Sequence, residues 1–148
     1  MIPKFRCWDE PNKTMRFNDE IVIWSGQVYI NEKKELDAKI KGFSCLPEYL
    51  MQSTGLKDKN GMEIFEGDVL LHTSSSVNYS DTYWHSYVQA YRMNSGAYRI
   101  KGKHIYDTEL MSSRNRIEVV GNIYQHQNLL EKEYFSTSDD IVEKANES

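Results

Sequence analysis

The chain has 148 residues, of which 39% are hydrophobic and 12% aromatic, and its formal net charge is −4. A chain of this length buries about 68–70% of its unfolded surface, so it needs neither a disulfide nor a metal ion for stability. Residues 1–128 carry 16 basic and 16 acidic residues, whereas residues 129–148 carry two basic and six acidic ones. The body is therefore neutral, which excludes a strong long-range attraction to nucleic acid.

The first forty residues predict two β-hairpins. Residues 4–8 and 14–17 form the first pair of alternating segments, with turn residues between them. Residues 21–24 and 27–30 form the second pair around Ser25-Gly26, a dipeptide typical of tight hairpin turns. The following charged segment, up to residue 41, is compatible with a loop or with a short helical turn.

The centre of the chain, TGLKDKNGMEIFEGDVLL at residues 54–71, is punctuated by turn residues. Gly and Asn tolerate a positive φ, and Asp bonds local backbone amides. We expect a strand to begin at Val69, directly after these turn residues, and a further turn near the end of the chain. The residues that we expect to shape these turns are Gly55, Asn60, Gly61, Gly67, Asp68 and Gly121.

The sequence after residue 71 predicts a serine-rich loop over residues 72–81, followed by further strands. Residues 83–93 alternate, Asn94-Ser95-Gly96 predicts a hairpin turn, and residues 97–104 return. Residues 116–124 are the last expected strand. Helical signals are confined to residues 129–135 and 140–145, so the pattern indicates a mainly β fold, either a small barrel or a sandwich.

Cys7 and Cys45 are far apart in the sequence and show no C-x-x-C spacing. We expect two separate, buried, reduced cysteines in a cytoplasmic protein, because two cysteines make a poor disulfide framework. No secretory signal or membrane-spanning segment is evident, because no apolar run approaches the ~20 residues that a spanning helix requires. Neither a cofactor nor a membrane partner is predicted.

Three blocks of sequence, in the same order, resemble the YopX-like proteins of phages and prophages. The blocks are FRCWDEPNKTM at residues 5–15, TGLKDKNGMEIFEGDVL at residues 54–70 and VVGNIYQHQNLL at residues 119–130. The resemblance implies an N-terminal β extension over residues 1–45 and an SH3-type β-barrel over residues 46–130. Residues 131–148 would then be an acidic tail, partly helical or disordered, and the host cell cytoplasm would be the location.

Glu63, Glu66 and Asp68 are the densest carboxylate group and could form a metal or acid–base site. The alternative, which we favour, is that Glu63 faces solvent and Asp68 bonds backbone amides in a turn. Asp19 with Glu32-Lys33-Lys34 matches a nuclease-like D…E-x-K pattern, but without the flanking helices of those enzymes. The four histidines show no zinc-binding spacing, and Ser74-Ser75-Ser76 lacks a nucleophile elbow.

Arg99, Lys101 and Lys103 would share one face of a regular strand, with Tyr91 and Tyr106 close in sequence. Small barrels bind single-stranded nucleic acid with such basic and aromatic surfaces. The alternative is a solvated basic face on an amphipathic strand, which the neutral body favours.

No catalytic constellation stands out, and the resemblance implies no established enzyme activity. We therefore expect a non-enzymatic phage or prophage accessory protein that acts by binding a protein partner or by self-assembly through exposed strand edges. Two alternatives stay open: a single-strand nucleic-acid-binding protein and, less favoured, a metal-dependent hydrolase.

Overall fold

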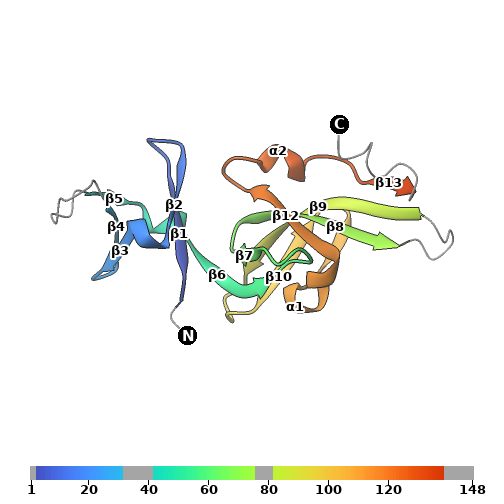
Figure 1. Ribbon diagram of the computed structural model, residues 1–148, viewed down its shortest axis with the longest axis horizontal. Coiled ribbons are helices and arrows are strands. Elements are labelled where there is room, and N and C mark those ends of the chain that lie inside the picture. The colour runs from blue at the N-terminus through green and yellow to red at the C-terminus, as the bar shows by residue number, and fades with distance from the viewer. Residues whose placement is uncertain (1–2, 32–41, 76–81, 139–148) are drawn as a thin grey trace. The chain divides into compact units, whose positions relative to one another are not determined.

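A computed structural model describes residues 3–31, 42–75 and 82–138, and it confirms a mainly β protein (Figure 1). The chain divides into two compact units, residues 1–53 and 54–148. The division lies later than the expected boundary at residue 45, because the first residues of strand β6 (Leu50–Lys57) pair with the strand β1 (Phe5–Asp9). Residues 32–34, which hold the nuclease-like pattern, lie outside the described residues.

Both hairpins expected in the N-terminal unit are confirmed. β1 pairs with β2 (Thr14–Phe17), and β3 (Ile21–Trp24) pairs with β4 (Gln27–Asn31), which also pairs with β5 (Gly42–Cys45). Two short 3-10 turns, Asn18–Glu20 and Pro47–Tyr49, connect these strands. The core of the unit consists of four buried side chains: Cys7, Val28, Ile30 and Cys45.

The prediction that the two cysteines are separate is wrong, although both are buried as expected. Cys7 on β1 and Cys45 on β5 form a disulfide, with their Cα atoms 7.5 Å apart. The sequence could not show this pairing, because antiparallel strands between the two residues bring them together in the core. The disulfide fastens the β1–β2 hairpin to the β3–β4–β5 sheet.

The C-terminal unit is a curled sheet in the order β11-β10-β9-β8-β12, with β13 also paired to β9 (Figure 1). Its long strands are β8 (Asp68–Ser75) and β9 (Thr82–Arg92), and β6 borders the short β7 (Glu63–Phe65). The other elements are β10 (Tyr98–Gly102), β11 (Ile105–Glu109), α1 (Leu110–Ser113), a 3-10 turn (Arg114–Arg116), β12 (Ile117–Asn122), α2 (Gln127–Leu130) and β13 (Phe135–Ser138).

Alternating residues of the curled sheet point into one apolar core. The buried side chains that fill it are Ile64, Leu70, Val88, Ala90, Ile100, Leu110 and Ile117. Each full burial of such an aliphatic side chain contributes about 1.5–3 kcal/mol. This core fixes the register of β8, β9 and β10, because a slip by one residue would turn every apolar side chain outward.

Several segments differ from expectation. Residues 72–75, which the sequence assigns to a serine-rich loop, belong to strand β8. The sequence predicts one strand over residues 97–104, but the structure forms the β10–β11 hairpin around Lys103 and His104. Part of the expected acidic tail is also ordered, because Phe135–Ser138 pairs with Thr82–His85 of β9 as β13. The helix expected over residues 129–135 is limited to the short α2, and residues 140–145 lie outside the described part of the chain.

Asn60, Gly61 and Gly67 lie in turns, whereas Gly55 lies within β6 and Gly121 within β12, so these two glycines are not the turn residues that the sequence predicts. Gly67 has a φ of +79°, and its N–H donates to the Ala90 carbonyl at 2.9 Å. Asp58 has a structural role that the sequence only hinted at: its carboxylate accepts N–H groups from Asn60, Met62 and Val119 at 2.8–2.9 Å. The polar turn is thereby tied to β12. Gly55 and Gly61 also have positive φ values.

Candidate binding site

The register of β8 and β9 places a group of polar and aromatic side chains next to the core. Leu70 lies opposite Val88, His72 opposite Ser86, and Ser74 opposite Trp84. Because alternate residues of a strand share a face, these pairs continue the inward face of the sheet beyond the apolar core. The inward face changes from aliphatic to polar and aromatic toward the end of the hairpin.

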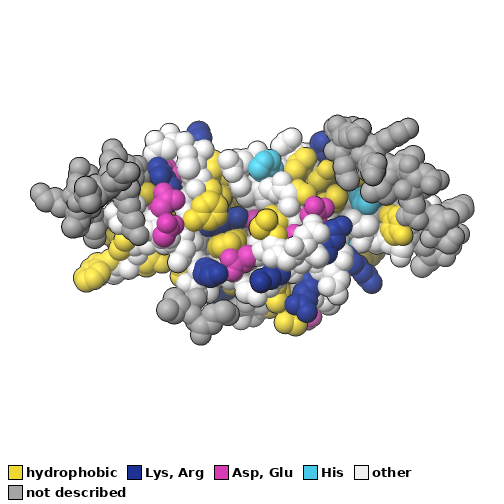
Figure 2. Space-filling view, viewed as in Figure 1, with side chains coloured by type: hydrophobic (Ala, Val, Ile, Leu, Met, Phe, Trp, Pro, Cys, Tyr) yellow, Lys and Arg dark blue, Asp and Glu magenta, His cyan; other side chains and the backbone are white. Residues whose placement is uncertain are grey.

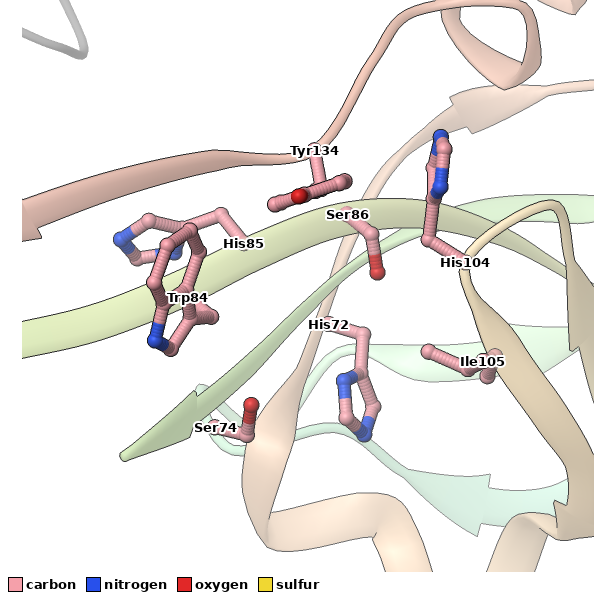
Figure 3. Close-up of a pocket in the computed structure, with 8 residues that line it drawn as sticks. All are labelled: His72, Ser74, Trp84, His85, Ser86, His104, Ile105 and Tyr134. Atoms are coloured by element: carbon pink, nitrogen blue, oxygen red, sulfur yellow. The ribbon is translucent and has the colours of Figure 1, made fainter. Parts of the chain in front are cut away.

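A hollow of about 410 Å³ lies at this position (Figure 3). The β10–β11 turn contributes His104 and Ile105 to it, and the segment before β13 contributes Tyr134. In Figure 3, Tyr134 and His104 lie on one side of the hollow and His72 and Ser74 on the opposite side, with Ser86 between. The lining residues are His72, Ser74, Trp84, His85, Ser86, His104, Ile105 and Tyr134.

Tyr134 contacts two other aromatic side chains at the hollow. Its ring centre lies 5.4 Å from that of Trp84 in a tilted arrangement, and 5.0 Å from that of His104, edge to face. Two polar side-chain pairs link the segment that carries Tyr134 to the β10–β11 turn: Glu133 Oε2 lies 3.3 Å from His104 Nε2, and Glu131 Oε2 lies 3.2 Å from Lys103 Nζ. The ring contacts and these exposed pairs place the aromatic side of the hollow beside the β10–β11 turn.

The lining of the hollow carries no carboxylate, lysine or arginine among the described residues. Burial, assisted by the nearby positive charge of Arg116, lowers the pKa of His72. Burial, assisted by Lys59, also lowers the pKa of His85. Both imidazoles are therefore neutral at physiological pH, and the hollow presents neutral hydrogen-bonding groups beside aromatic rings.

His85 has a structural role at the edge of the hollow. Its Nδ1 lies 2.9 Å from the Thr73 hydroxyl and its Nε2 lies 2.6 Å from the Thr137 hydroxyl. Its ring stacks on Phe135 with the ring centres 4.9 Å apart. His85 therefore links β8, β9 and β13.

The carboxylates singled out in the sequence are spread along a turn. Asp68 is buried, and its Oδ2 accepts the Phe65 N–H at 2.8 Å, as expected for a turn residue. Glu63 begins β7, and Glu66 lies in the turn between β7 and β8. Within the part of the chain that the structure describes, no His, Cys, Asp or Glu cluster has the arrangement of a metal site.

The structure brings together only some of the basic and aromatic side chains that the sequence predicts on one strand face. Lys101 Nζ lies 4.7 Å from the centre of the Tyr91 ring, and Arg99 donates to the Asp107 carbonyl at 2.9 Å. Lys103 lies in the β10–β11 turn and pairs with Glu131, because an irregularity in register interrupts the alternation after Ile100. Arg99 lies opposite Tyr91, on the face of the sheet that points away from the hollow.

A smaller hollow of about 240 Å³ lies in the N-terminal unit beside Cys45, Trp8 and Tyr49. Its acidic side chains are engaged with neighbours: Asp9 pairs with Arg16 at 2.9 Å, and Glu10 accepts the Trp8 indole N–H. Burial raises the pKa of Asp9, but hydrogen bonds from Asn12 and Arg16 outweigh it and lower the pKa overall. This hollow is better explained by the packing of the β1–β2 hairpin than by a ligand.

Charged side chains of both signs lie among neutral ones on the face seen in Figure 2. This distribution agrees with the neutral body of the sequence. The aromatic hollow is a more specific feature of the C-terminal unit than the mixed charges seen on this face.

Sequence reasoning missed the hollow. The three histidines that line it come from β8, β9 and the β10–β11 turn, so no local spacing connects them. The one available signal was Trp84, a large aromatic residue on the same strand face as Ser86 and Val88. The sequence places Tyr134 in the acidic tail, so it gives no reason to connect this residue with the strands.

Residues 4–131 match the family model described as YopX protein. The chain belongs to the YopX family. This YopX chain is also similar in structure to protein EF1440 from Enterococcus faecalis, with 26% sequence identity and a TM-score of 0.55. The similarity covers 88% of this chain and 99% of that one, and no curated protein matches. Among the described residues, no helix is long and apolar enough to cross a membrane.

Proposed function

We propose that this YopX protein is an accessory protein of a phage or prophage, and that it acts in the host cytoplasm by binding rather than by catalysis. Its C-terminal unit is, in this proposal, an SH3-type barrel whose curled sheet presents a binding site, and its N-terminal unit is the β extension. Fold class alone supports little about function, so the proposal depends on the site.

The observation that carries the proposal is the open aromatic hollow. Its volume of about 410 Å³ lies in the range of ligand sites, which is about 300–1,000 Å³. Trp84 and Tyr134 stay 39% and 51% exposed, although aromatic rings of this size normally gain stability by burial. Two exposed rings that contact each other at a hollow are typical of a surface that a binding partner covers.

A photo-crosslinking experiment tests this proposal. A photoreactive phenylalanine at Tyr134 reports on the hollow, and the same group at Tyr106 is a matched control, because Tyr106 is 96% exposed and does not line the hollow. In cells that carry the gene, we expect a discrete covalent adduct from position 134 and none from position 106. Identical or absent adducts at both positions would contradict the proposal.

Self-assembly is the second part of the binding proposal. β3 is an edge strand with the sequence IVIW, and Trp24 at its end is 72% exposed. An apolar edge strand without a charged residue readily pairs with another copy of itself. Sedimentation equilibrium is expected to show a dimer that Ile23→Lys dissociates, whereas a monomer at all concentrations would remove this part of the proposal.

The second candidate function is single-strand nucleic-acid binding, which the Lys101–Tyr91 contact favours. Together with Arg99 it places basic groups and an aromatic ring on one exposed face. Fluorescence anisotropy with a labelled oligonucleotide at low and high salt tests it. A triple alanine variant of Arg99, Lys101 and Lys103 is expected to weaken binding, and unchanged affinity would contradict this candidate.

A further inference from the structure

We propose that the hollow of the C-terminal unit binds a nucleobase, supplied either by a free nucleotide or by one unit of a single strand. The inference rests on the proposed function, which makes this hollow a binding site, and it adds the chemical class of the ligand. Two properties of the described lining residues support it: flat aromatic surfaces and neutral hydrogen-bonding groups. The cationic side chains that lie outside the hollow are a third supporting feature.

The aromatic surfaces fit a planar ligand. Trp84 and Tyr134 are tilted by 55° at 5.4 Å, and His104 meets the Tyr134 ring at 65°. Because Trp84 and Tyr134 are only partly covered, each presents ring surface to the hollow. Bases stack on Trp, Tyr and His side chains whatever their sequence, since every base has a π face.

The hydrogen-bonding groups favour a base over a hydrocarbon ring. Ser74 and Ser86 each offer a hydroxyl that can donate and accept, and a neutral His72 offers one donor and one acceptor. Ser86 is buried, and in Figure 3 it lies between the other lining side chains. A phenylalanine or leucine side chain would cover these groups without using them, which costs free energy, whereas the edge of a base carries matching donors and acceptors.

The charges around the hollow fit a ligand with a neutral inner part and a negative outer part. The described lining holds no carboxylate, lysine or arginine, His72 and His85 are neutral, and His104 is engaged with Glu133, so a buried ammonium, carboxylate or phosphate would have no dedicated counter-ion there. Arg116 acts on His72 from outside the hollow, and Lys103 is adjacent to His104. The Lys103–Glu131 pair is half-exposed and therefore weak, so Lys103 can contact a phosphate.

Calorimetric titration of the full chain tests the proposal with four kinds of probe. Adenosine and uridine supply the base alone, AMP and UMP add a phosphate, and a single-stranded ten-nucleotide oligomer supplies linked units. Indole and p-cresol imitate the aromatic side chains of a protein partner. We expect nucleosides to bind, nucleotides to bind more tightly, and indole and p-cresol not to compete. Tighter binding of the oligomer than of nucleotides would identify a single strand as the source.

Two tyrosine variants show whether the hollow is the site. Tyr134→Ala removes one stacking ring and is expected to weaken binding about tenfold or more. Tyr106→Ala is the matched control, since this exposed tyrosine of the same unit does not line the hollow, and it should change nothing. Ser74→Phe is a second variant that fills the hollow from the half-exposed end of β8 and should abolish binding without removing a core contact.

Several results would overturn the proposal. One is that no nucleoside or nucleotide binds at millimolar concentration. Another is that the oligomer binds equally well to wild type and Tyr134→Ala but loses affinity in a double alanine variant of Arg99 and Lys101, which would place nucleic acid on the opposite face. If indole or p-cresol binds and nucleosides do not, the hollow takes a protein side chain, and the nucleobase inference fails while the proposed binding function stands.

Discussion

At the scale of single residues, His85 is one group through which pH acts on the stability of the C-terminal unit. It is buried and hydrogen-bonded to Thr73 and Thr137, and burial lowers its pKa from the ordinary value of 6.5. His72 is shifted in the same direction, chiefly by burial. As the pH falls below 6.5, the unfolded chain takes up protons more readily than the folded chain, so folding becomes less favourable.

We expect the free energy of unfolding to fall as the pH decreases from 6.5 toward the lowered pKa values, and then to level off. Urea unfolding at pH 7.5, 6.0 and 5.0 measures this. The double variant His72→Asn, His85→Asn should be less stable at pH 7.5 but should lose most of the pH dependence in this window. An unchanged slope in the double variant would show that other groups cause the effect.

Gly121 shows a close approach that only glycine permits. An added Cβ would lie 2.3 Å from His126 Nδ1 and 2.8 Å from His126 Cβ, so the whole imidazole would have to move. The same Nδ1 accepts the Asn122 N–H at 3.1 Å. Glycine is therefore required here by space, whereas Gly67 is required by its positive φ.

Gly121→Ala is expected to destabilise the protein by about 1–3 kcal/mol, because it overpacks this turn and breaks the Asn122–His126 hydrogen bond. A double-mutant cycle tests this explanation: thermal or urea unfolding is measured for Gly121→Ala, for His126→Ala and for the double variant. The double variant should lose less stability than the sum of the two single variants, since removing the imidazole makes room for the new methyl group. Strictly additive effects would contradict the steric explanation.

At the scale of elements, β13 is the strand that completes the candidate site. It pairs with the first residues of β9, stacks Phe135 on His85 and follows directly after Tyr134. The sequence does not predict this strand, because residues 131–138 hold only a short alternating pattern and belong to the part of the chain with an acidic balance. Its formation depends on the free edge that β9 offers beyond the end of β10.

A chain that ends at Leu130 is expected to be less stable than one that ends at Ser138, by about 2 kcal/mol or more. The shorter chain loses the Phe135 contacts and leaves His85 Nε2 without its Thr137 partner. Ending the control at Ser138 removes residues 139–148 from both variants. Equal urea midpoints for the two chains would show that β13 does not contribute to stability.

At the scale of the whole molecule, two units form separate cores, and the Cys7–Cys45 disulfide belongs entirely to the first. It joins residues 38 apart in sequence, a loop length for which a cross-link contributes about 3–4 kcal/mol. Disulfides are rare in reducing compartments, so the surroundings of the protein decide whether the bond is present. The second core contains no cysteine.

Reduction is therefore expected to destabilise the N-terminal unit selectively. Hydrogen exchange measured with and without dithiothreitol should show faster exchange in residues 5–31 and 42–53, with little change in residues 63–75 and 82–122. Alkylation of the denatured, unreduced protein should leave both cysteines unmodified. Uniform exchange changes, or two alkylated cysteines, would contradict this expectation.

Local sequence patterns were sufficient for most strands and for the family. Alternation of side chains predicts the β1–β2 and β3–β4 hairpins. Turn residues predict the turn at Gly67, and the ordered motifs predict the family whose model matches residues 4–131. Each of these patterns involves only residues that are close together in the sequence. The β10–β11 turn was missed because Lys103 and His104 are not typical turn residues, and contacts with the core override their weak local preferences.

The sequence by itself determined a mainly β chain of the YopX family with a neutral body and a turn-rich centre. Only the tertiary structure decided which residues meet: Cys7 with Cys45, Lys101 with Tyr91, and His72, Trp84 and Tyr134 around one hollow. The physical reason is that the register of paired strands and the burial of apolar faces are properties of the whole chain. Local spacing specifies each strand, but the side chains that share a site are set by which strands become neighbours.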